Sequence, residues 1–145
     1  MQINTGTETY SKVGIKRLRK LAHHLIEGKL GHKNFDITRW NDSDTNRCGT
    51  RGCAVGECPI VFVNEWKFDM DGNPILRGKN SKECGTMNEA QHFFSLTGNE
   101  ALGMFMHGHA LHVGSKRLPA MSFKIKSYSV GRRILKYCDI VEGNK

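Results

Sequence analysis

The chain has 145 residues, the usual size of one compact domain, and its 38% of hydrophobic residues is enough for a folded core. No apolar run approaches the roughly 18 residues that a membrane-spanning helix needs, so we expect a soluble protein that does not contact a membrane. Lys and Arg total 22 against 14 Asp and Glu, and the resulting net charge of +8 favours an anionic partner. We expect one domain over residues 1–145. The first residues, Met1–Tyr10, are polar and lack the basic and then apolar layout of a secretory signal. We therefore expect the cysteines to lie in a reducing cytoplasm.

The positive charge lies mainly at the two ends of the chain. Residues Met1–Lys33 carry seven Lys and Arg against two acids, and Ser115–Lys145 carry eight against two. The middle, Asn34–Gly114, has seven against ten and is mildly acidic. Charge of one sign at both ends predicts that the ends meet on one face of the fold. The alternative is that these basic residues only form solvated helix faces that bind no partner.

The first helix is predicted from about Ser11 to Glu27. Its apolar residues follow the i, i+3, i+4, i+7 spacing of one buried helical face: Leu18, Leu21, Ala22, Leu25 and Ile26. Ser11 is a suitable N-cap and Gly28 a suitable C-cap. Five Lys and Arg between Lys12 and Lys20 occupy mainly the other sides, so this helix presents a dense positive surface.

The middle of the chain is predicted to hold turns and short strands. The stretch from Gly28 to Arg47 is turn-rich, with core anchors at Phe35, Ile37 and Trp40. A β-branched and aromatic run at Ile60–Val63 indicates a further short strand. Trp66–Phe68 and Pro74–Leu76 flank an Asp-Gly pair, which favours a hairpin.

Two short helices are predicted next. Thr86-x-x-Glu89 and Thr97-x-x-Glu100 both have the capping-box form that opens a helix. A helix-turn-helix that reads DNA is disfavoured, because the second helix offers no Arg, Lys or Gln toward a groove. We therefore expect a packed helical hairpin.

The last part of the chain is predicted to be a strand and a helix. Met121, Phe123 and Ile125 alternate with polar residues, as in a strand with a basic outer row. Ser127 or Ser129 then caps a helix with a buried stripe of Val130, Ile134, Tyr137 and Cys138 and with Arg132, Arg133 and Lys136 outside. The expected fold is α+β, a compact single domain that is mainly helical with a small antiparallel sheet or hairpin.

The densest chemistry lies in the segment from Cys48 to Pro59, which contains the core Cys48-Gly49-Thr50-x-x-Cys53-Ala54-x-Gly56. With Phe35-Asp36 and Trp40 ahead of it and Phe93-Phe94-Ser95-Leu96-Thr97 behind, this segment resembles a group of short tailed-bacteriophage proteins that share the Cys-Gly-Thr-x-x-Cys-Ala-x-Gly core. The likeness covers roughly Leu18 to Phe105. It implies a phage setting and no particular mechanism.

The cysteines of this segment have three interpretations. In the preferred one, Thr50 caps a short helix from Arg51 to about Glu57, and the thiols are buried packing groups. Zinc binding is an alternative in which Cys84 and the group His107-x-His109-x-x-His112 join Cys48, Cys53 and Cys58. The third is a nucleophilic enzyme, with Cys48 activated by a helix start and by Arg47 and Arg51, and with one of the histidines as the base.

Several of the same residues predict an anion site. The candidate ligand contacts are Arg47, Thr50, Arg51, His107, His109, Arg132 and Arg133. Helix-start amides and cationic side chains bind phosphate well. We therefore expect a phage accessory protein of the host cytoplasm that sequesters an anionic nucleotide-derived signalling molecule without catalysis and so blunts a host defence. A basic nucleic-acid-binding protein and a Cys/His or zinc-dependent enzyme are the alternatives. No cofactor besides that alternative zinc is expected, and a homo-oligomer is left open.

Overall fold

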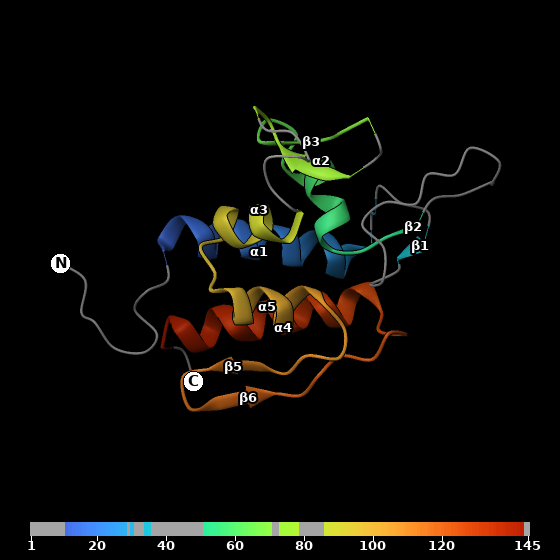
Figure 1. The fold of residues 1–145 in the computed structure, drawn as a ribbon. Helices are drawn as coiled ribbons and strands as arrows, with labels where there is room; N and C mark the ends of the chain where they lie inside the picture. The colour runs from blue at the N-terminus through green and yellow to red at the C-terminus, as the bar shows by residue number, and fades with distance from the viewer. Residues whose placement is uncertain are drawn as a thin grey trace.

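Two long helices from opposite ends of the chain pack against each other in the computed structural model (Figure 1). Helix α1 spans Lys12–Glu27 and helix α5 spans Ser127–Val141, and they run antiparallel. As predicted, the Ser11 side chain caps α1 by accepting a hydrogen bond from the Gly14 amide, and Gly28 ends the helix with a φ of 74°. The buried stripe predicted for the last helix is also confirmed.

The structure describes residues 11–28, 30, 34–35, 51–70, 73–78 and 86–143. Besides α1 and α5, the helices are a 3₁₀ turn η1 (Val55–Glu57), α2 (Cys58–Val61), α3 (Thr86–Phe93) and α4 (Gly98–Phe105). The strands are β1 (Asn34–Phe35), β2 (Arg51–Gly52), β3 (Trp66–Phe68), β4 (Pro74–Leu76), β5 (Leu111–Val113) and β6 (Lys116–Leu118). Strands β1 and β2 pair in parallel.

Two antiparallel hairpins lie on opposite sides of the helices (Figure 1). The predicted hairpin of β3 and β4 is confirmed, with Trp66 opposite Leu76. The second hairpin pairs Leu111 of β5 with Leu118 of β6. Its two-residue turn begins at Gly114, whose φ of 60° suits the tight reversal. The expected α+β class, mainly helical with small antiparallel hairpins, is therefore confirmed.

An aromatic cluster fills the space between α1, α2 and α3. Phe93 lies edge-on to both Phe62 and Trp66, with ring centroids 4.9 and 5.5 Å apart. The guanidinium of Arg17 lies 4.0 Å from the Phe93 ring centroid and donates a hydrogen bond to the Phe93 carbonyl. Part of the positive charge of α1 is therefore used in packing.

Three sequence predictions about local structure are wrong. The run at Ile60–Val63 begins inside helix α2, where Pro59 occupies the first turn that suits it. Met121–Ile125 forms no strand, because Ser122 makes a turn: its carbonyl accepts from the Ile125 amide and its hydroxyl from the Lys124 amide. Finally, α5 begins one residue after Lys126, so Ser127 is its first helical residue and neither serine is the cap.

The structure tests one of the two predicted capping boxes, because the Thr86 side chain of the other lies outside the described residues. Thr97 and Glu100 form the full box at the start of α4, which confirms that prediction. Glu89 of α3 is buried, and its Oε1 accepts a hydrogen bond from the Leu76 amide on β4, so it ties α3 to the β3–β4 hairpin.

Within the ranges given above, none of the helices combines the length and apolar character that crossing a bilayer requires.

Candidate functional site

The two basic ends of the chain meet where α1 packs on α5. Gly131 allows this approach, since a Cβ there would lie 2.6 Å from the Ala22 carbonyl oxygen. On the outer side of the contact, Arg19 donates hydrogen bonds to Asp139 and Glu142. The prediction that the two ends converge is confirmed for these two helices. The two acids at the C-terminal end of α5 accept hydrogen bonds from Arg19 of α1.

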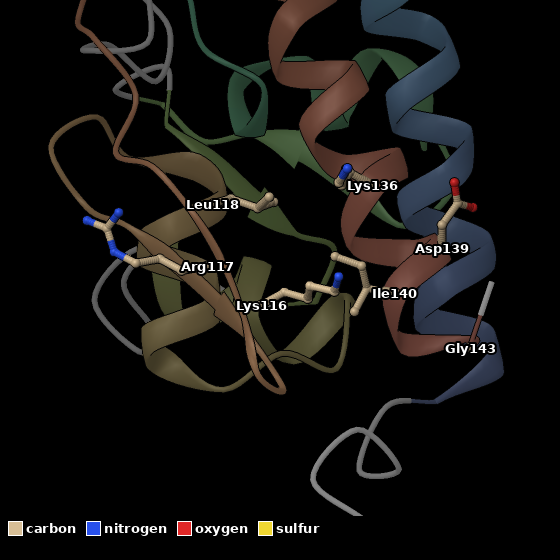
Figure 2. A pocket seen from close by; sticks show the side chains of 7 residues that line it. All are labelled: Lys116, Arg117, Leu118, Lys136, Asp139, Ile140 and Gly143. Carbon is tan, nitrogen blue, oxygen red and sulfur yellow. The ribbon is translucent and has the colours of Figure 1, made fainter. Parts of the chain in front are cut away.

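An open hollow of about 610 Å³ lies between strand β6 and the C-terminal half of α5 (Figure 2). We call it the β6–α5 hollow; its lining residues are Lys116, Arg117, Leu118, Lys136, Asp139, Ile140 and Gly143. Figure 2 shows Lys116 and Leu118 directed from β6 toward α5, whereas Arg117 extends to the other side of the strand. This alternation follows from the two-residue period of a strand, which places Lys116 and Leu118 on the same face.

The electrostatics of the β6–α5 hollow favour an anion. Lys116 and Lys136 are exposed and bring positive charge from two different elements. Asp139, the one acid among the described lining residues, lies 3.1 Å from the guanidinium of Arg19, which it shares with Glu142, so its charge is partly offset from outside the hollow. Leu118 and Ile140 supply an apolar surface between the cations. The hollow therefore offers both a phosphate-binding charge and an apolar contact.

The residues predicted near Thr50 do not form the expected helix start. Arg47 and Thr50 lie outside the described residues, and Arg51 is described only by its backbone. Arg51 and Gly52 form strand β2, and the first helical turn begins later, at Val55. The prediction of a helix from Arg51 to Glu57 is therefore wrong. An anion site built on amides directly after Thr50 loses its basis.

Arg133 has a structural role that the sequence did not reveal. Its guanidinium donates hydrogen bonds to the carbonyls of Gly103, Pro119 and His109, and burial lowers its pKa. These bonds tie α5 to the end of α4 and to both flanks of the β5–β6 hairpin. Arg132, one residue earlier, is exposed, and its guanidinium lies 5.7 Å from the Tyr128 ring centroid. Of the two predicted arginines, Arg132 is the one exposed to solvent.

The predicted histidines lie away from the lining of the β6–α5 hollow. His107 is exposed beside Phe123, with ring centroids 6.5 Å apart. His109 lines a second, more polar hollow of about 530 Å³ next to α4, together with His112 and Glu100. Glu100 is already engaged there, because it caps α4 and accepts a hydrogen bond from the Tyr137 hydroxyl. Among the residues that the structure describes, no group of three or more His, Cys, Asp or Glu is placed to hold a metal ion.

The described cysteines are buried packing groups, as the preferred interpretation expected. Cys53, Cys58 and Cys138 are fully buried free thiols. Burial raises the pKa of Cys53 to about 12 and that of Cys138 to about 12, and it raises that of Cys58 well above the usual value. These thiols stay protonated at neutral pH and are poor nucleophiles. Cys48 and Cys84, on which the enzyme and zinc interpretations also depend, lie outside the described residues.

The buried Cys53 thiol predicts a loss of stability in alkali. Its pKa is raised from 9.0 to about 12, so the thiol favours the folded state below about pH 9, and this contribution falls as the pH rises toward 12. At about pH 10.5 the loss from this thiol is about 2 kcal/mol relative to pH 8. Urea unfolding at both pH values should therefore show a smaller alkaline loss for Cys53→Ala than for the native chain. Equal losses would contradict the buried, protonated thiol.

The lysines of the β6–α5 hollow were missed as site residues because they are far apart in the sequence and meet only when β6 lies beside α5. One sequence signal would have directed attention to this hollow. From Ala101 to Cys138 the chain has seven Lys and Arg and no Asp or Glu, so β6 and most of α5 fall in a stretch without acids.

No known protein family, no curated protein and no solved structure matches this chain.

Proposed function

We propose that this protein binds an anionic, nucleotide-type small molecule in the β6–α5 hollow and does not act on it chemically. The observation that carries the proposal is the pairing of Lys116 from β6 with Lys136 from α5 across an apolar surface. The acid beside them, Asp139, is engaged by Arg19. A ligand with phosphate at one end and an apolar or aromatic group at the other matches this arrangement.

The size and side chains of the hollow support a small ligand. A volume of about 610 Å³ falls within the range of pockets that enclose compounds of this size. Lysine ammonium groups bind phosphate as point charges, and Leu118 and Ile140 can contact a base or ribose. Among the residues of the lining that the structure describes there is no His, Cys or Ser, and the one carboxylate, Asp139, is ion-paired with Arg19. Binding without catalysis is the simplest function for such a lining.

The biological setting in this proposal comes from the sequence. The resemblance of the Cys48-to-Gly56 core to tailed-bacteriophage proteins supports a phage accessory protein that acts in the host cytoplasm. There, sequestering a nucleotide-derived signal would blunt a host defence that depends on that signal. The resemblance supplies the setting, and the β6–α5 hollow supplies the chemistry of the ligand.

A thermal-shift panel of cyclic and linear nucleotides, each paired with its unphosphorylated nucleoside, tests this function. At a ligand concentration of 100 times Kd, binding adds about 2.7 kcal/mol to the free energy of unfolding. For a chain of this length we expect Tm to rise by about 5–10 °C with at least one nucleotide and to stay constant with its nucleoside. The rise should change little with salt, because few phosphates are contacted. If no nucleotide raises Tm, the proposal is wrong.

A further inference from the structure

A second surface of this protein carries two exposed aromatic side chains near the start of α5. Phe123 is 59% exposed and Tyr128 is 50% exposed. Among the side chains that the structure describes, the other exposed large hydrophobics are aliphatic: Val13, Ile60, Val63 and Met70. Neither Phe123 nor Tyr128 lines the β6–α5 hollow. The exposure of two rings in one short segment therefore needs its own explanation.

Each of these rings is accompanied by a cation. The Lys124 ammonium lies 5.7 Å from the Phe123 ring centroid, and the Arg132 guanidinium lies 5.7 Å from that of Tyr128. Lys126, between the two rings in sequence, is also exposed. The segment belongs to the stretch from Ala101 to Cys138 that contains no acid. Aromatic faces and positive charge thus occur together, with no carboxylate in the same stretch to neutralise them.

The surroundings of the rings favour a polar, charged partner over a lipid surface. Polar residues separate the two rings in sequence, among them Ser122, Ser127 and the two lysines. The apolar residue between them, Ile125, is only partly exposed. A membrane-binding face requires a continuous apolar surface, which two rings divided by polar residues do not provide. A partner that alternates flat rings with negative charges matches the pattern better.

We propose that Phe123 and Tyr128 form a stacking platform for the bases of a single-stranded nucleic acid, whose phosphates contact Lys124, Lys126 and Arg132. The two rings are five residues apart, so their Cα atoms are separated by at most about 18 Å, within reach of one strand of a few nucleotides. Bases stack on aromatic side chains with little dependence on sequence, and neighbouring cations follow the backbone. This platform lies on residues distinct from the β6–α5 hollow and does not depend on the function proposed for the hollow.

Fluorescence anisotropy with a labelled oligothymidine of about 12 nucleotides tests the platform. We expect the native chain to bind it, and about 20-fold more weakly at 200 than at 50 mM salt if three phosphates are contacted. The double variant Phe123→Ala/Tyr128→Ala should bind about 30-fold more weakly at the lower salt. Because both rings are exposed, its Tm should match that of the native chain, and Phe123→Trp/Tyr128→Trp should restore binding.

A matched control removes two exposed side chains outside the platform. Val13→Ala/Val63→Ala should leave oligonucleotide affinity within about twofold of the native value. The platform is refuted if the native chain does not bind the oligonucleotide. It is equally refuted if Phe123→Ala/Tyr128→Ala binds like the native chain, or if the two rings are needed for anionic vesicles and not for the oligonucleotide. Each of these results leaves the nucleotide thermal shift intact, so the two proposals fail separately.

Discussion

Replacing Glu57 with alanine should lower the free energy of unfolding by about 3 kcal/mol. Glu57 is fully buried in η1, and its Oε1 lies 2.7 Å from Nε2 of His24 on α1. The substitution removes this hydrogen bond across the core and leaves a cavity where the carboxylate was. His24 is only 17% exposed, so water replaces the lost partner incompletely. Urea unfolding at neutral pH measures the loss.

Two further variants separate the role of the Glu57 carboxylate from a general effect of losing an acid. Glu57→Gln keeps the shape and one hydrogen bond, so it should cost only about 1 kcal/mol. Glu65→Ala removes an exposed acid nearby and should change stability by less than about 0.5 kcal/mol. If Glu57→Ala were no more destabilising than Glu65→Ala, the His24–Glu57 contact would not hold η1 to α1.

Replacing Gly131 with alanine should lower the free energy of unfolding by about 2 kcal/mol, although alanine is the better helix former. The new Cβ would lie 2.6 Å from the Ala22 carbonyl oxygen and 2.7 Å from Cγ1 of Ile26, so α1 must move. Overpacking of this kind costs about 3 kcal/mol, and helix propensity returns about 1 kcal/mol. Calorimetry should show Tm falling by about 6 °C.

Gly98 provides the control for Gly131, because its substitution by alanine should raise the free energy of unfolding and not lower it. Gly98 is the first residue of α4, and a Cβ there would meet only Oε1 of Gln91, at an ordinary 3.7 Å. Gly98→Ala should therefore stabilise the protein slightly, by about 0.5 kcal/mol. A Gly131→Ala variant as stable as Gly98→Ala would contradict the close α1–α5 packing that brings the two basic ends together.

Local sequence signals predicted those parts of the fold that depend on local interactions. The ends of α1 follow from the Ser11 cap and from Gly28, and the buried stripe of α5 follows from helical spacing. The same reasoning failed at Met121–Ile125, where a turn made by the Ser122 side chain competes with a strand. Alternation alone does not reveal that competition, because the choice depends on whether a partner strand is present.

The candidate site depended on contacts that no local pattern encodes. Lys116 and Lys136 are 20 positions apart and become neighbours only through the packing of β6 beside α5. Arg133 looks like any exposed arginine of an amphipathic helix, yet the carbonyls that it binds come from three separate segments. Predicting either role from the sequence would have required the tertiary arrangement first.

Nucleotide binding in the β6–α5 hollow is tested most directly by calorimetric titration of the most stabilising nucleotide into the native chain and into Lys116→Ala/Lys136→Ala. Each lysine should contribute about tenfold in Kd through its charge on phosphate, so the double variant should bind about 100-fold more weakly. Lys67→Ala/Lys16→Ala removes one exposed lysine from a strand and one from a helix outside the β6–α5 hollow, and it should bind like the native chain. Unchanged affinity in Lys116→Ala/Lys136→Ala, or an equal loss in the control, would contradict the assignment of the nucleotide to this hollow.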